Sequence, residues 1–149
     1  MTKQLTWEQI RIKETGTILH DQFKDGLRFI VMRGPSSLCA YVGVPIDHPL
    51  AHFDYDDLPV TAHGGLTFAG EGDKWRPEGF YWYGWDYSHA GDKSMFAKEL
   101  PDNLLALHGD DKEWLVQDVI RDSEDTLFDF KSLLRLAEQI KKETLKEDK

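Results

Sequence analysis

Cysteine is scarce in this sequence: its 149 residues include only Cys39. A lone cysteine forms no intramolecular disulfide framework and excludes zinc sites built from several thiolates. Because Cys39 lies in the apolar run 38–44, we expect a buried structural thiol rather than a reactive one.

Positive charge is also scarce. Lysine and arginine number 18 against 27 aspartates and glutamates, which gives a formal net charge of −9 at pH 7. This charge repels phosphate backbones and anionic lipids, and no basic cluster interrupts it, so we expect neither a nucleic-acid polymer nor a membrane as partner. A small anionic ligand is still compatible, because a few backbone amides or one arginine can hold a phosphate.

Long apolar runs are missing. No stretch approaches the roughly 20 apolar residues of a membrane-spanning helix, and the first residues lack the basic start and apolar block of a signal peptide. These features predict a cytoplasmic protein.

Common nucleotide-enzyme motifs are missing as well. No glycine-rich loop ends in Lys-Ser or Lys-Thr, and there is no dinucleotide fingerprint or nucleophile elbow. ATPase, dehydrogenase and serine hydrolase activities are therefore disfavoured.

The apolar residues that are present predict an antiparallel sheet. Residues 26–33 and 38–44 are apolar runs joined by the turn residues 34–37, as is typical of a β-hairpin. Both runs are apolar on two sides, so other layers should cover part of each sheet face. Residues 58–69 and 79–85 would continue the sheet as an antiparallel meander of four or five strands.

Helical spacing is clearest near the C-terminus. Apolar residues recur with helical period from about residue 129 to residue 143, which predicts an amphipathic helix packed on the sheet. Residues 6–9 fit a capping box before a short helix, although the residues that follow would equally suit a strand. Residues 110–113 fit a second capping box, which would precede a helix or a strand at 114–121. The predicted fold is therefore α+β in one domain spanning residues 1–149, with the last few residues expected to fray.

Histidine, glycine and threonine meet in the segment His63-Gly64-Gly65-Leu66-Thr67. If residues 58–69 are extended, His63, Gly65 and Thr67 point to one small, polar face. Gly64 and Gly65 leave room for a ligand or another backbone to come close. A lone histidine beside two glycines is more often a hydrogen-bonded turn residue, but the polar residues expected nearby favour a functional role.

Those polar residues follow the aromatic strand expected at 79–85. Three of them stand at or beyond its end: Asp86, His89 and Asp92. Loops at strand ends often carry binding and catalytic groups. We expect Trp85 in a pocket wall, and Asp92 either binds the ligand or caps the turn. His48 lies in the loop 45–57, rich in proline and aspartate, which could form a lid over the site.

Together these segments resemble a family of uncharacterised small proteins of phages and prophages. The resemblance rests on the motifs HGGLTF, from His63, and GWD-x-x-HAGD, from Gly84, and it covers about residues 38–92, with a looser similarity in the last helix. It implies a shared site and a phage context in the host cytosol, but no chemistry. Relatives often have cysteine where this chain has Tyr87, which argues against a thiol nucleophile. The segment 99–125 inherits nothing from the family.

Two specific chemistries fit the spacing poorly. His63, Asp86, His89 and Asp92 are ligand types for a divalent metal, but zinc signatures place two histidines close together, whereas His63 and His89 are 26 residues apart. We therefore expect neither a metal nor another cofactor. Two-histidine phosphoesterases repeat a His-x-Thr unit, whereas Thr67 follows His63 by four residues in a single copy.

Three functions are compatible with these features. The first is a small hydrolase or lyase acting on a nucleotide-like ligand, with His63 and His89 as the acid–base pair and Asp86 orienting one imidazole. Six further residues would contact the ligand: Gly64, Gly65, Thr67, Trp85, Asp92 and His48. The second function is a sponge that sequesters such a ligand unchanged, and the third is a protein-binding inhibitor using the acidic surface. Two histidines with adjacent carboxylates exceed what anion capture needs, which slightly favours the enzyme.

Overall fold

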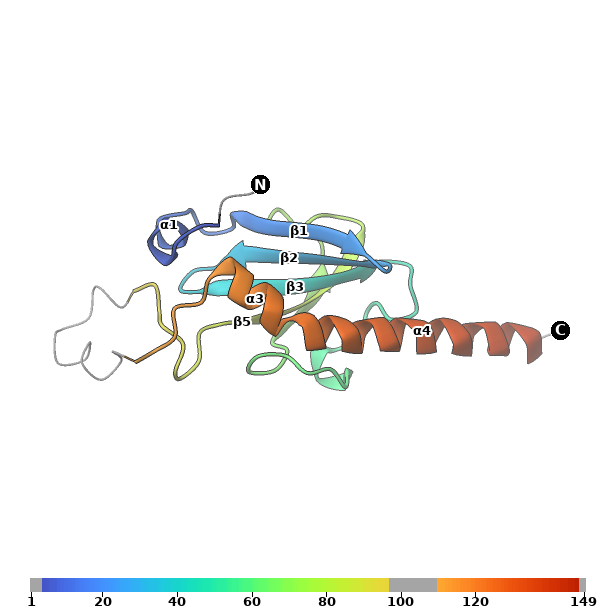
Figure 1. Cartoon of the computed structure of the whole chain (residues 1–149). Coiled ribbons are helices and arrows are strands. Elements are labelled where there is room, and N and C mark those ends of the chain that lie inside the picture. The colour runs from blue at the N-terminus through green and yellow to red at the C-terminus, as the bar shows by residue number, and fades with distance from the viewer. Residues whose placement is uncertain (1–3, 97–109, 148–149) are drawn as a thin grey trace.

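The computed structural model describes residues 4–96 and 110–147 (Figure 1). Five strands form one sheet: β1 (Ile18–Lys24), β2 (Leu27–Arg33), β3 (Leu38–Pro45), β4 (Phe68–Glu71) and β5 (Phe80–Asp86). The helices are α1 (Trp7–Arg11), the 3-10 helix η1 (Tyr55–Asp57), α3 (Val116–Asp122) and α4 (Glu124–Glu147). All neighbouring strands are antiparallel, so the predicted α+β class is confirmed. Residues 148 and 149, where we expect fraying, lie outside the described residues.

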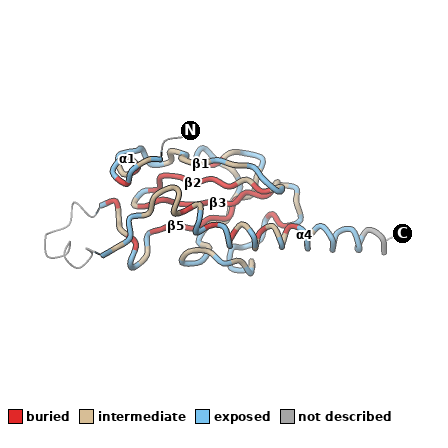
Figure 2. Tube along the Cα trace, in the orientation of Figure 1, coloured by how far each residue is buried: buried red, intermediate tan, exposed pale blue. Residues whose placement is uncertain are grey.

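The β2–β3 hairpin lies at the centre of the sheet and is buried on both faces, as its sequence predicts (Figure 2). On one face, Phe29 and Val42 pack in the main core with residues of α3 and α4. On the other face, Trp82 is buried beside Ile30 and donates its indole N–H to the carbonyl of Pro77 at 2.9 Å. The segment between β4 and β5 therefore covers this second face.

Cys39 also agrees with its prediction. It is a free, buried residue, 8% exposed. Burial, together with the nearby carboxylate of Asp86, raises the pKa of the Cys39 thiol to about 11.

The long helix α4 begins earlier than expected, at Glu124, and ends later, at Glu147. Its first half packs on the sheet through buried Phe130 and Leu134. Its second half extends past the sheet, where Leu136 and Ile140 are exposed (Figures 1 and 2).

The prediction of a strand at residues 58–69 is wrong for most of this segment. Only β4, from Phe68, is a strand, and residues 58–67 form a loop. Alternate residues of the loop are partly buried against the main core, which reproduces the sequence pattern of a strand: Val60, Ala62 and Leu66. The backbone N–H of Thr61 donates to the carboxylate of Asp129 at 2.8 Å, which fastens the loop to α4.

The strand order β1-β2-β3-β5-β4 also corrects the expected meander. After β3 the chain passes through residues 46–67, which include η1, forms β4 at the far edge, and returns as β5 between β3 and β4. The aromatic strand β5 thereby takes the buried position, while the short strand β4 takes the exposed edge, where short strands are common.

Two segments whose sequence fits either a helix or a strand, the one after residues 6–9 and the one at 114–121, contain helices. Thr6 and Gln9 form a capping box, with bonds of 3.2 and 2.9 Å between each side chain and the other's backbone N–H, and α1 follows. The helix α3 begins only at Val116, where the carboxylate of Asp118 accepts a hydrogen bond from the N–H of Leu115. None of the helices in the described ranges combines the length and apolar character needed to cross a membrane.

Candidate functional site

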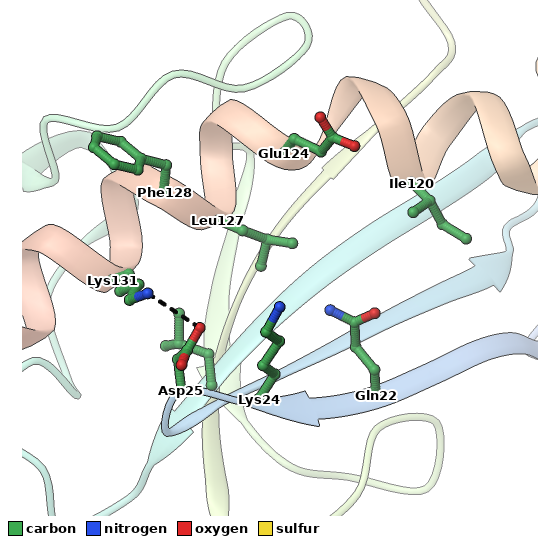
Figure 3. A pocket seen from close by; sticks show the side chains of 9 residues that line it. Gln22, Lys24, Asp25, Ile120, Glu124, Leu127, Phe128 and Lys131 are labelled. Atoms are coloured by element: carbon green, nitrogen blue, oxygen red, sulfur yellow. Dashed lines mark ion pairs between the residues drawn. The ribbon is translucent and has the colours of Figure 1, made fainter.

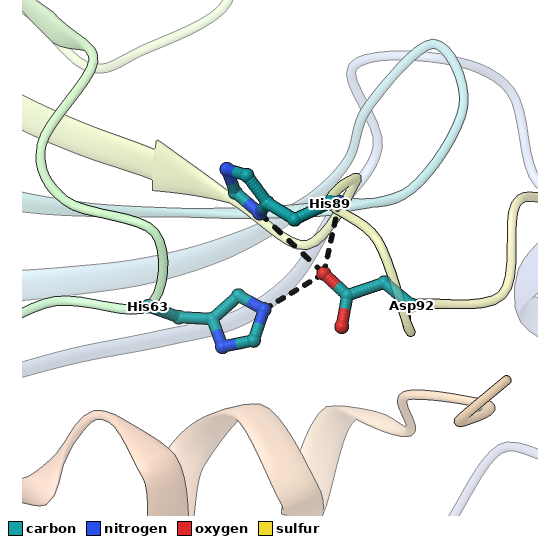
Figure 4. Close-up of side chains that lie close together, drawn as sticks. All are labelled: His63, His89 and Asp92. Atoms are coloured by element: carbon teal, nitrogen blue, oxygen red, sulfur yellow. Dashed lines mark hydrogen bonds and ion pairs between the residues drawn. The ribbon is translucent and has the colours of Figure 1, made fainter.

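The centre of the candidate site is the carboxylate of Asp92, whose side chain is only 5% exposed. Its Oδ2 atom lies 2.7 Å from Nε2 of His63 and accepts a hydrogen bond from the backbone N–H of His89 at 3.0 Å. The same oxygen is 3.4 Å from the ring atom Nδ1 of His89 (Figure 4). Oδ1 accepts a hydrogen bond from the indole N–H of Trp114 at 2.8 Å. One carboxylate therefore joins three segments that are far apart in the sequence.

The turn after β5 positions both His89 and Asp92. Asp86 ends the strand, and its Oδ1 atom accepts a hydrogen bond from the N–H of Ser88 at 3.1 Å, which turns the chain. The N–H of Asp92 then donates to the carbonyl of His89 at 2.9 Å, and Gly91 adopts the φ of +91° that this turn requires. The turn brings the carboxylate back beside the histidine.

A short parallel bridge between Asp92 and Lys112 brings in Trp114. The N–H of Lys112 donates to the carbonyl of Gly91, and the N–H of Lys93 donates to the carbonyl of Lys112, both at 2.8 Å. Trp114 follows the bridge by two residues and precedes α3. Nζ of Lys112 lies 4.3 Å from the centre of the Trp114 ring, so a cation stands close to the candidate site.

His63 is held in a tight turn, which the N–H of Gly65 closes by donating to the carbonyl of Ala62 at 2.9 Å. Gly64 and Gly65 both have positive φ values, +69° and +84°. Gly64 lies directly against the imidazole of His89, and a Cβ atom at this position would overlap the ring. Gly64 is therefore required for the close approach of the two loops, as the sequence suggests.

The imidazole of His63 lies in an aromatic surround. It stacks on Tyr87, with ring centres 4.6 Å apart and an interplanar angle of 16°, and it meets Trp114 edge to face at 4.9 Å. The hydroxyl of buried Tyr87 accepts a hydrogen bond from the indole of Trp85 and donates one to the carboxylate of Asp122. Burial raises the pKa of Tyr87, so this ring is a neutral support for His63.

Hydrogen bonding controls the charge of Asp92. Burial by itself raises the pKa of the carboxyl, but hydrogen bonds from His63, from the N–H of His89 and from Trp114 outweigh it, so the pKa lies below its usual value. Asp92 is therefore an anion at neutral pH, and Nε2 of His63 donates to it. In neutral His63 this leaves the ring lone pair on Nδ1.

The structure brings His63, His89 and Asp92 together, with the two imidazole centres 5.3 Å apart. Asp86, which we expected to orient one imidazole, lies within ion-pair distance of His89, with Oδ1 3.8 Å from Nε2, and the same oxygen accepts the N–H of Ser88. The contact with His63 comes from Asp92.

Three of the predicted ligand contacts lie elsewhere. Trp85 is 2% exposed in the main core, so it supports Tyr87 and does not line a pocket. His48 is held by the N–H of Leu50 and lies 3.2 Å from Glu138 on α4, so it does not cover the cluster. Thr67 is exposed next to β4, and its backbone N–H donates to the carbonyl of Gly84.

Sequence reasoning missed Trp114 and the supporting role of Tyr87. Trp114 comes 22 residues after Asp92, and no local spacing connects the two. Tyr87 lies inside the GWD-x-x-HAGD motif, but the motif does not show that its ring faces His63.

A separate groove of about 320 Å³ lies between α4 and the β1–β2 turn (Figure 3). Leu127 faces it from the helix and Lys24 from the sheet, while Lys131 pairs with Asp25 at 3.3 Å. None of the site residues predicted from the sequence lines this groove.

No family model, curated protein or solved structure matches the chain. The fold and the site define an α+β protein with a histidine–aspartate–histidine cluster beside the end of its central aromatic strand.

Proposed function

We propose that this protein is a small hydrolase or lyase that acts on a nucleotide-like ligand, with His63 and His89 as its acid–base pair. The observation that carries the proposal is the position of Asp92, one oxygen of which faces both imidazoles. A carboxylate that fixes the tautomer and orientation of an imidazole is a recurrent feature of histidine catalysis.

The geometry supports distinct roles for the two histidines. With Nε2 of His63 donating to Asp92, Nδ1 is the atom that could accept a proton from the attacking group. The side chain of His89 is the more exposed, at 36% against 24% for His63, so we assign to His89 the proton transfer to the leaving oxygen. The 5.3 Å between ring centres keeps both residues beside one small ligand.

Charge and aromatic surface support a nucleotide-like ligand. The net charge of −9 argues against a polymer, whereas Lys112 stands beside Trp114 and could hold a single phosphate group. Trp114 is partly exposed, so the part of its ring that His63, Tyr87 and Lys112 leave uncovered could pack against a base. The resemblance to phage proteins favours a host signalling nucleotide, met in the host cytosol.

A sponge for the same ligand is the second candidate. It is favoured by the hydrogen bonds of Asp92, which fasten three segments together and therefore also explain the cluster as a binding scaffold. A protein-binding inhibitor remains the third.

The test is incubation of the protein with a panel of cyclic and linear nucleotides, analysed by mass spectrometry, after identifying any ligand that co-purifies. In an enzyme, His63→Ala and His89→Ala should slow turnover by about 10²–10⁴-fold and leave much of the affinity. His52→Asn, which removes an exposed imidazole outside the cluster, should change neither. Wild-type protein that returns every nucleotide intact after long incubation would overturn the enzyme, and tight binding of one of these nucleotides would then favour the sponge.

A further inference from the structure

We infer that His63, His89 and Asp92 form a binding site for a divalent transition-metal ion such as zinc. Each side chain offers one donor atom, and these atoms lie within 4.8 Å of one another. Across residues 4–96 and 110–147, no other group of three metal-ligating side chains meets in this way. Two imidazoles and one carboxylate are a donor set that zinc uses where a water molecule completes its coordination.

The spacing of the donor atoms suits an ion. Zinc lies about 2.0–2.2 Å from nitrogen and oxygen ligands, so two tetrahedral ligands are about 3.4 Å apart. Nδ1 of His89 and Oδ2 of Asp92 already have this separation, at 3.4 Å. Nε2 of His63 is 2.7 Å from the same oxygen, so its ring must withdraw by about 0.7 Å to exchange the hydrogen bond for an ion.

An independent observation concerns Nδ1 of His89. This atom is fully covered and makes no hydrogen bond within the described part of the chain. Covered polar atoms nearly always have a partner, so one without a partner requires an explanation such as an ion. An ion between His89 and Asp92 would supply the partner (Figure 4).

Residues that would not touch the ion fix the orientation of the three side chains, as the residues around the ligands of known metal sites do. The indole N–H of Trp114 binds the oxygen of Asp92 that faces away from the histidines, and Tyr87 stacks on His63. Such contacts fix ligand orientation before the ion arrives. They come from residues outside the cluster, so a variant can weaken the support without removing a ligand.

Ion binding should also affect catalysis. This effect rests on the proposed function, whereas the binding itself does not. An ion held by Nε2 of His63 and Nδ1 of His89 takes lone pairs of both rings, and each remaining ring nitrogen then carries a proton. Neither ring can then act as a free base, so zinc should suppress the acid–base activity.

The test is calorimetric titration of zinc chloride into the 149-residue chain, freed of metal with EDTA and then dialysed. We expect one ion per chain. His63→Gln and His89→Gln should each lower the zinc affinity by at least about 100-fold, because each variant removes a ligand of the ion. Trp114→Phe removes only a hydrogen bond to the ligand Asp92, so it should lower the zinc affinity by about tenfold. The control His52→Asn should leave it unchanged. Cobalt(II) supplies a spectroscopic readout, because its visible absorption should change when Asp92→Asn removes the anionic ligand.

Equal zinc affinity in the wild type, His63→Gln and His89→Gln would overturn the ion site. His89→Gln keeps this test valid even if Asp92→Asn fails to fold. The two proposals fail separately. Zinc that suppresses nucleotide turnover supports both, and turnover that requires zinc supports the ion site but removes the acid–base roles. Turnover by a protein that binds no zinc overturns the ion site alone.

Discussion

At the scale of single residues, Gly64 controls how closely the two histidine loops approach. Gly64→Ala should place a methyl group against the imidazole of His89 and displace the ring. The positive φ of +69° adds a conformational cost of about 1–2 kcal/mol for a residue with a side chain. We expect lower stability in urea unfolding and a change in the NMR signals of the His89 ring.

Gly65→Ala is the matched control for this experiment. Gly65 has a similar φ of +84°, but a Cβ atom there meets nothing within 4 Å. Its variant should lose a similar amount of stability and leave the His89 signals in place. Equal displacement of His89 in both variants would show that the turn as a whole, rather than the contact at Gly64, positions the ring.

Asp92 makes the second prediction at this scale. Its folded-state pKa lies below the ordinary value of 3.8, so its contribution to stability is present above about pH 5 and is lost as the pH falls below about 4. Asp92→Asn should therefore cost stability at pH 7, on the order of 1.5–3 kcal/mol for a hydrogen bond to a charged group. Urea unfolding from pH 7 to pH 3 should show the difference between wild type and variant shrinking in acid. A constant difference would mean that the ionised form is not the stabilising one.

The choice between two aspartates could not be made from the sequence. Asp86 precedes His89 by three residues and Asp92 follows it by three, so spacing favours neither. The direction of the turn decides, because Oδ1 of Asp86 binds the N–H of Ser88 while Asp92 folds back toward His63. The sequence could predict that the histidines meet, but not which carboxylate joins them.

At the scale of elements, α4 contains two leucines that should respond very differently to the same substitution. Leu134 is 6% exposed in the main core and Leu136 is 53% exposed. Leu134→Ala should cost about 2–5 kcal/mol through lost burial and a cavity. Leu136→Ala should change stability by less than about 0.5 kcal/mol. Urea unfolding measures both, and similar losses would contradict the packing of α4 on the sheet.

The elements that sequence analysis predicted are those with two buried faces or a strong helical period. The β2–β3 hairpin, β5 and α4 belong to this group. The strand β1 was not predicted, because it is an edge strand in which no residue is fully buried, so it lacks a regular apolar pattern. The loop 58–67 gave the opposite error, since a loop that packs on a core repeats the alternation of a strand.

At the scale of the whole molecule, the order of the strands in the sheet could not be predicted from local sequence patterns. Placing β5 between β3 and β4 depends on which strand gains most from burial, and Trp82, Tyr83 and Trp85 all become buried there. This arrangement brings the end of β5 beside the loop that carries His63, because the N–H of Thr67 bonds to the carbonyl of Gly84. The candidate site is thus a product of the topology.

Because His63 lies far in sequence from the turn that carries His89 and Asp92, the three ligands meet only in the folded chain, and ion binding should be linked to global stability. A ligand at 100 times its dissociation constant stabilises the folded state by about 2.7 kcal/mol when it binds that state alone. For a domain of this size each kcal/mol raises the Tm by about 2–4 °C, so zinc at that excess should raise the Tm by about 5–10 °C. His52→Asn should show the same shift, and His89→Gln at the same zinc concentration should show almost none. If zinc stabilised His89→Gln as much as the wild type, the ion would be bound by other groups, and the assembly of His63, His89 and Asp92 would not be its site.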